Sequence, residues 1–152
     1  MKYIEKTFVL VFVTLMVICM TSFDNDAQAQ DMVVIVNSDN PIGNMTSADA
    51  KNYFLRKVKA RWPDTNAKIK PVDRIGDPQE KSDFYEKVLE MSRGDVTRYF
   101  MERQYQKAQS TPSKKPSGTS VVDYVAMTPG AIGYVKSSEA NGNSSVKVVF
   151  AF

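Results

Sequence analysis

The stretch MVVIV, residues 32–36, constrains the fold more than any other part of the sequence. It is a continuous run of apolar, mostly β-branched residues, without the alternation of a strand that has one face in water. A strand with this pattern is buried on both faces, as in a sheet with helices on either side. We therefore expect residues 32–36 to form an inner strand, and we expect that strand to belong to a parallel sheet.

Strand and helix patterns alternate after this run. One helix start is marked by Thr46 as N-cap and by Asp49 in the first turn. The expected strands are 32–36, 69–74, 131–135 and 146–152, and the expected helices are 47–58, 78–91, 96–109 and 121–127. This order predicts a single α/β domain over residues 30–152, whose mixed, mostly parallel sheet is flanked by helices.

Several connections carry specific expectations. Gly94 is expected to end the helix 78–91, with Asp95 capping the next one. The polar Pro/Ser/Gly stretch 110–120 is the best candidate for a mobile loop. Pro71 lacks an N–H and places the strand 69–74 near an edge of the sheet.

The segment TPGAIGYV, residues 128–135, interrupts an apolar run with one proline and two glycines. A proline cannot continue a helix, and a glycine readily adopts the backbone of a tight turn. We expect Thr128, Pro129 and Gly130 to end the short helix and to turn the chain directly into a buried strand.

The first 29 residues have the layout of a secretory signal peptide, which would be removed from the mature protein. Two lysines precede an uncharged apolar run, residues 7–20, and Ala27-Gln28-Ala29 forms a small-x-small cleavage site. The apolar run is short for a membrane span, which takes about 20 residues. We expect cleavage after Ala29 and a periplasmic or secreted location. The alternative is an N-terminal anchor that is retained.

The composition offers little of what enzymes use. The sequence has no histidine, and its one cysteine, Cys19, lies in the predicted signal peptide without the preceding small residues of a lipoprotein signal. No phosphate-loop, zinc-protease or serine-hydrolase motif occurs. We therefore expect no enzyme activity, no metal and no organic cofactor.

The charge balance bears on partners. The sequence carries 20 Lys+Arg against 17 Asp+Glu, which is mildly basic and compatible with a small anionic ligand. It lacks the dense basic tract with interleaved aromatic residues that would predict nucleic-acid binding. Contact with the membrane is expected only through the signal peptide.

The best candidate site is DRIGDPQE, residues 73–80, where a strand ends, turns and opens a helix. The free N–H groups and the dipole of a helix N-terminus favour an anion, and an arginine at the strand end can add a bidentate contact. The candidate ligand contacts are Arg74, Gly76, Asp77, Gln79 and Glu80. The alternative, which the residues alone favour, is that Asp77 and Glu80 satisfy those N–H groups and repel an anion.

A second candidate is the loop NSDNPIGN, residues 37–44, which also follows a strand. Ser38 and Asn40 could hydrogen-bond a polar ligand there, although such residues more often only shape a turn. The string Ser117-Gly118-Thr119 could cradle a phosphate, but short strings of this kind are common in loops.

Four stretches, VVIVNSDNPI, SADAKNYFLRKVKARWPD, IKPVDRIGDPQEKSDF and TPGAIGYV, occur in this order along the chain. Together they resemble the phosphate-binding protein of ABC-type phosphate transporters. The positions in step with that family's motifs are Phe54, Leu55, Lys57, Trp62, Asp64, Pro71, Val72, Arg74 and Phe84. The resemblance spans roughly residues 33–135 and implies a type 2 periplasmic binding-protein fold.

The sequence departs from that family in two ways. The chain has room for one of the family's two lobes, so it resembles the short, single-domain members. The family's S-G-T motif falls at Pro78, Gln79 and Glu80, so only Arg74 carries over as a phosphate ligand by residue type.

The resemblance implies an exported substrate-binding-like protein that binds phosphate or another oxyanion around Arg74. A lone lobe leaves its ligand exposed, so a homodimer or an envelope protein is the expected source of a second surface. The alternative is that the lobe has lost its ligand and serves as a periplasmic protein-interaction module.

Overall fold

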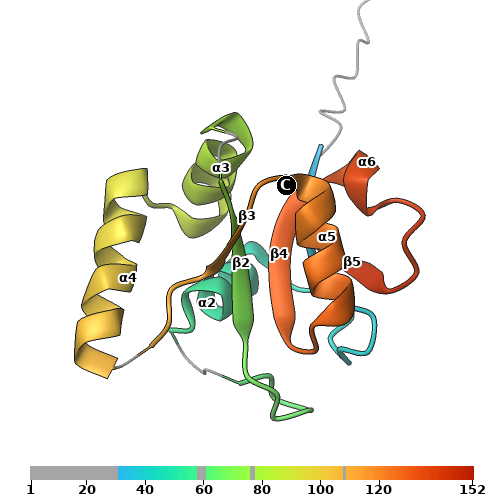
Figure 1. Ribbon diagram of the computed structural model, residues 1–152, viewed down its shortest axis with the longest axis horizontal. Coiled ribbons are helices and arrows are strands. Elements are labelled where there is room, and N and C mark those ends of the chain that lie inside the picture. The colour runs from blue at the N-terminus through green and yellow to red at the C-terminus, as the bar shows by residue number, and fades with distance from the viewer. Residues whose placement is uncertain (1–30, 58–60, 76–77, 108) are drawn as a thin grey trace, which may run out of the picture.

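The computed structural model describes residues 31–57, 61–75, 78–107 and 109–152. Its strands are β1 (Met32–Asn37), β2 (Lys70–Arg74), β3 (Ser113–Lys115), β4 (Ala131–Lys136) and β5 (Val146–Ala151). Its helices are α2 (Ser47–Leu55), α3 (Pro78–Phe84), α4 (Arg93–Lys107), α5 (Gly118–Met127) and α6 (Ser137–Ala140), and a π-helical turn, η1 (Tyr85–Leu89), continues α3. The strands form one sheet in the order β3-β2-β4-β1-β5 (Figure 1).

The predicted signal peptide lies outside the described residues. Within the ranges that the structure does describe, no helix is both long enough and apolar enough to cross a membrane.

The α/β class and the mixed sheet flanked by helices are confirmed, but the expectation that the strand 32–36 pairs in parallel is wrong. Strand β2 runs parallel to β3 and β4, whereas β1 runs antiparallel to both of its neighbours, β4 and β5. Strand β1 is buried along its whole length, as its sequence predicts. Two-sided burial therefore reflects helices on both faces of the sheet and does not reveal the direction of the strand.

Each face of the sheet carries its own apolar cluster. Helices α2 and α4 and the turn η1 contribute to one cluster, and α5 and α6 contribute to the other (Figure 1). The fully buried side chains of the first cluster include Phe54, Trp62, Phe84, Val88, Leu89 and Tyr134, and those of the second include Ile35, Val72, Val121 and Val125. Burying one such large side chain stabilises the fold by about 1.5–3 kcal/mol.

The predicted start of α2 is confirmed in its details. The Thr46 hydroxyl accepts a hydrogen bond from the Asp49 N–H, and the Asp49 carboxylate accepts one from the Thr46 N–H. This reciprocal capping box satisfies two N–H groups at the helix start. The Thr46 hydroxyl also forms a hydrogen bond with the Asp49 carboxylate at 2.7 Å, and this bond is the main reason that the pKa of Asp49 is lowered.

Two predicted connections are wrong. Gly94 lies inside the first turn of α4, because the chain already leaves η1 at Glu90, which has a left-handed backbone (φ 53°), and the Ser92 hydroxyl accepts from the Asp95 N–H. The stretch 110–120 contains β3 and the first turn of α5. A short edge strand such as β3 is held by backbone pairing with β2, so its Ser-Lys-Lys sequence shows no hydrophobic pattern.

Pro71 is accommodated because β2 is the second strand from the edge. The Lys70 N–H donates to the Gly130 carbonyl in the turn before β4, so the backbone N–H position of the next residue faces the opposite neighbour. On that side β3 begins only opposite Val72. Position 71 therefore needs no N–H donor.

The predicted turn at Thr128, Pro129 and Gly130 is confirmed. Helix α5 ends at Met127, and Gly130 adopts a left-handed backbone (φ 84°) immediately before β4. A Cβ at position 130 would overlap the Lys68 carbonyl oxygen. The Gly130 carbonyl accepts a hydrogen bond from the Trp62 indole N–H at 3.0 Å, so this turn also fixes the segment 61–68, whose ends pair through an antiparallel bridge between Arg61 and Lys68.

Gly133 and Tyr134, which follow in β4, have separate roles. A Cβ at Gly133 would lie 2.7 Å from Cγ1 of Val121, so the glycine lets α5 pack closely on β4. Tyr134 points to the other face, where its ring stacks on Phe84 with the centroids 4.1 Å apart.

The two ends of the described chain lie side by side. The Phe152 N–H donates to the Met32 carbonyl at 2.9 Å, and the Ser137 N–H donates to the Asp31 carbonyl at 2.7 Å. Strand β5 thus returns to the start of β1.

Alanine substitutions at three glycines test this account of residues 128–135. Gly130→Ala combines an unfavourable backbone with a clash and should lower the free energy of unfolding by at least about 2 kcal/mol. Gly133→Ala overfills the α5–β4 contact and should cost about 1–3 kcal/mol. Gly43→Ala, whose Cβ meets nothing within 4 Å, should leave stability unchanged or slightly raised. Urea unfolding measures all three, and equal effects would contradict the account.

Candidate functional site

Arg74 lies at the carboxyl end of β2 and is almost entirely buried. Its guanidinium forms an ion pair with the Glu80 carboxylate of α3, and both side chains are less than a tenth exposed. Lys136 at the end of β4 places its ammonium 3.0 Å from the same carboxylate. Strand β2, strand β4 and helix α3 therefore meet in one charge cluster, in which Arg74 and Glu80 are buried and Lys136 is exposed.

A second carboxylate approaches this cluster from α6. Glu139 Oε2 lies 3.6 Å from Arg74 Nη1, and it also accepts from the Lys136 N–H at 3.0 Å. The Glu139 carboxylate rests against the first residue of α5, because a Cβ at Gly118 would overlap it. Glu139 thus holds a negative charge between an arginine and a helix N-terminus.

The start of α5 is well placed to favour a negative charge. Ser117 caps this helix, since its hydroxyl accepts from the Ser120 N–H at 3.1 Å. The first N–H groups of a helix lack partners within the helix, and its dipole is positive at that end. The string Ser117-Gly118-Thr119, which the sequence left open as a phosphate cradle, lies next to the Arg74 cluster.

The structure also shows what opposes an anion. Arg74 and Lys136 supply two positive charges, and Glu80 and Glu139 supply two negative ones. The Glu80 side chain pairs with Arg74, so an incoming anion must compete for that arginine. The alternative in which Asp77 and Glu80 satisfy the N–H groups of the helix start remains a prediction, because Asp77 lies outside the described residues.

Three other predicted site residues lie close to Arg74 in the sequence. Gln79 is exposed, and its amide donates to Asp83 at 2.7 Å along the helix. Gly76 and Asp77 lie outside the described residues.

Ser38 and Asn40 lie at the opposite end of the sheet from Arg74, because β1 runs antiparallel to β4 while β2 runs parallel to it. Ser38 is exposed, and its N–H donates to the Ser145 carbonyl. Asn40 is buried, and its side chain accepts from the Ile42 N–H. The loop is organised by its own hydrogen bonds, and a ligand role for these two residues remains a prediction.

Asp73, next to Arg74, forms a separate polar cluster on the other face of the sheet. Its carboxylate accepts from the hydroxyls of Tyr134 at 2.7 Å and Tyr85 at 2.9 Å. The Lys81 ammonium lies 2.7 Å from Oδ2. Four donors, including the Arg74 N–H at 2.8 Å, therefore surround one buried carboxylate.

The same arrangement shifts the two tyrosines. Burial is the largest cause that raises the pKa of Tyr85 and the pKa of Tyr134, and the negative charge of Asp73 raises both further. Both phenols therefore stay protonated and serve as hydrogen-bond donors.

Sequence reasoning identified Arg74 and Glu80 but missed Lys136 and Glu139. These two residues are far along the chain, and the register of β2 with β4 brings them to the same place. Asp73 carried a usable signal, because an acidic residue that directly follows Pro71 and Val72 in a predicted strand is expected to have partners if that strand is buried. No group of three or more metal-binding side chains occurs in the part of the chain that the structure describes.

The Asp73 cluster predicts a loss of stability at alkaline pH. A tyrosine whose pKa is higher in the folded than in the unfolded state contributes stability that is complete below the unfolded value of about 10 and is lost as pH rises above it. The free energy of unfolding, measured with urea, should therefore fall as the pH rises above about 10.

The variants Tyr85→Phe and Tyr134→Phe should each lose about 1 kcal/mol at neutral pH and show a weaker alkaline decline. Tyr105→Phe is the matched control, because Tyr105 is 85% exposed. An alkaline decline that is the same in all three variants would contradict the assignment.

No protein-family model matches the sequence, and no curated protein matches it. Solved structures do match the fold. One is a candidate phosphate ABC transporter substrate-binding protein from Clostridium perfringens with bound phosphate, at 18% identity and a TM-score of 0.59, over 78% of this chain and 44% of that one.

Two further solved structures of phosphate-transport proteins match the fold equally well. An ABC-type phosphate transport receptor from Vibrio cholerae matches at 16% identity and a TM-score of 0.58, over 78% of this chain and 45% of that chain. PstS from Borrelia burgdorferi matches at 17% identity and a TM-score of 0.58, over 78% of this chain and 46% of that chain. The chain spans less than half the length of these proteins. Its fold is that of a single lobe of phosphate-transport substrate-binding proteins, as the resemblance in the sequence implied.

Proposed function

We propose that this protein binds a small oxyanion, phosphate first of all, reversibly and without chemical turnover. One observation carries the proposal: the buried Arg74 guanidinium faces a carboxylate that rests on the N-terminus of α5. A buried arginine and a helix N-terminus are both suited to bind phosphate oxygens. The fold that the chain shares with phosphate-transport proteins supports the same ligand class.

The Glu139 carboxylate takes the place of the ligand in the unbound protein. Its side chain is a quarter exposed and belongs to a one-turn helix, whereas Glu80 is buried. Glu139 is therefore the carboxylate that an incoming oxyanion displaces, while the Arg74–Glu80 pair stays in place. The displaced carboxylate returns to water, which limits the electrostatic cost of binding.

This arrangement makes the lone lobe a weak binder. The ligand has to compete with Glu139, and it is covered from one side only. A second surface, from another copy of the chain or from an envelope protein, would bury the ligand and raise the affinity. Export through the predicted signal peptide would bring the lobe to such partners.

A second function is favoured by the Arg74–Glu80 pair itself. A buried arginine that is fully neutralised by the protein's own carboxylates needs no ligand. In that case the lobe acts as a ligand-free interaction module, and its melting temperature rises only when a partner protein binds.

A melting scan with phosphate separates the two functions. At constant ionic strength, the melting temperature of residues 30–152 should rise with millimolar phosphate and rise more in Glu139→Gln, because the competing charge is gone. At a phosphate concentration about 100 times Kd, the free energy of unfolding should rise by about 2.7 kcal/mol.

The double variant Arg74→Leu with Glu80→Leu removes the cation without leaving its buried partner unpaired, so it should fold but not respond to phosphate. Chloride is the control salt, and sulfate and small carboxylates test selectivity. No response to any anion in either the wild type or Glu139→Gln would eliminate the oxyanion function and leave the interaction module.

A further inference from the structure

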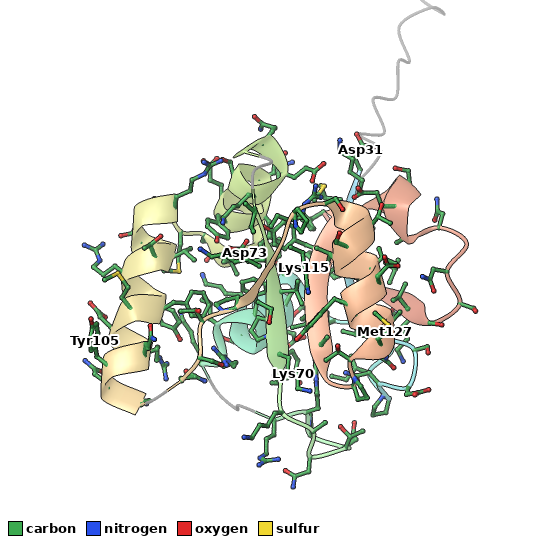
Figure 2. All side chains as sticks on the ribbon, viewed as in Figure 1. Asp31, Lys70, Asp73, Tyr105, Lys115 and Met127 are labelled. Carbon is green, nitrogen blue, oxygen red and sulfur yellow. The ribbon has the colours of Figure 1, made fainter. Side chains whose placement is uncertain are left out.

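A cavity of about 380 Å³ lies at the end of the sheet opposite Arg74. It is formed where α2 ends, where the chain enters β2 and where α4 ends. Its polar lining consists of Arg56, Arg61, Lys68, Lys107, Gln109 and Ser110. Figure 2 shows the length of β2 between the two regions, with Lys70 at the lower end of the strand and Asp73 at the upper end.

The described residues that line the cavity carry four positive charges and no carboxylate. Among the described residues none of these four cations forms an ion pair. Arg61 donates to the Asn66 carbonyl at 2.7 Å, and Arg56 donates to the Ser110 carbonyl, so their hydrogen bonds go to neutral backbone oxygens. The charge in the cavity is therefore not compensated by this part of the protein.

Arg56 is the unusual member of this group. It has a left-handed backbone (φ 51°) at the end of α2, and it is 8% exposed. Its Nε–H is buried without a hydrogen-bond partner, and so is the side-chain oxygen of Gln109. Burial also lowers the pKa of Arg56, which reflects the cost of holding an uncompensated charge there. Unpaired buried polar atoms are rare in proteins, and a bound ligand is one explanation of them.

We propose that this cavity binds a small phosphate-bearing polyanion at a site separate from Arg74. Four converging cations suit a ligand with two or more negative charges. Phosphate oxygens would accept from the Arg56 guanidinium and pair with the ammonium and guanidinium groups of the other three cations. The ligand would thus compensate the charge in the cavity.

The exposed cations at the rim have a different role from Arg56. Arg61, Lys68 and Lys107 all have solvent-exposed side chains. They would attract a polyanion and hold its outer charge, and Arg56 would fix the group that enters deepest. A monoanion would gain little from the rim, so the site selects by charge number.

The test is isothermal titration calorimetry of residues 30–152 with inorganic pyrophosphate at constant ionic strength. Binding is expected, and the variant Arg61→Ala with Lys107→Ala should weaken it by at least about tenfold. Both residues are exposed, so the variant should fold normally. Lys87→Ala with Lys114→Ala removes two exposed cations elsewhere and should leave the pyrophosphate affinity unchanged.

Two further arms identify the site and the source of the phosphate. The double variant Arg74→Leu with Glu80→Leu should bind pyrophosphate as the wild type does, which separates this site from the proposed oxyanion site. Vesicles that contain phosphatidic acid test a lipid headgroup against a soluble ligand. Binding to either probe that depends on Arg61 and Lys107 supports the proposal. No binding to either probe, or equal loss in the Lys87 and Lys114 control, overturns it.

Discussion

The buried carboxylate of Asp73 is the interaction on which the arrangement of this lobe depends. It lies at the end of β2 and accepts hydrogen bonds from Tyr134 of β4, from Tyr85 of η1 and from Lys81 of α3. Strand β4, which is distant in sequence, and the adjoining α3 and η1 are thereby held to one strand end. A buried carboxylate is costly unless its partners are all in place, so the cluster favours a single arrangement of these elements.

The alternation of a β-strand then places the functional charge on the opposite face. Because Asp73 points toward the α3–η1 side, Arg74 points toward α5 and α6, where Glu139 and the start of α5 lie. The stack of Tyr134 on Phe84 and the hydroxyl bond to Asp73 fix β4 against this strand end. The structural cluster on one face thus sets the position of the candidate site on the other.

The local signals of the sequence were sufficient for most elements but not for their directions. The Thr46 N-cap and the buried strand at 32–36 each depend on neighbouring residues, and both were predicted correctly. The antiparallel course of β1 is decided by long-range pairing with β4, which no local pattern contains. The edge strand β3 is held by backbone bonds and leaves no hydrophobic signature. In the same way Arg74 was found from its motif, whereas Glu139 and Lys136 depend on strand register.

The hydrogen bond from Phe152 to Met32 has a consequence for protein engineering and for evolution. A unit such as residues 31–152, whose two ends adjoin, can be inserted into a surface loop of another protein through two short linkers, without stretching either chain. It also suits circular permutation, because a short peptide could join Phe152 to Asp31 while a new break is opened at an exposed turn, such as the one at Gly142. The lobe is therefore a modular unit that can be combined with a second lobe in one chain or remain on its own.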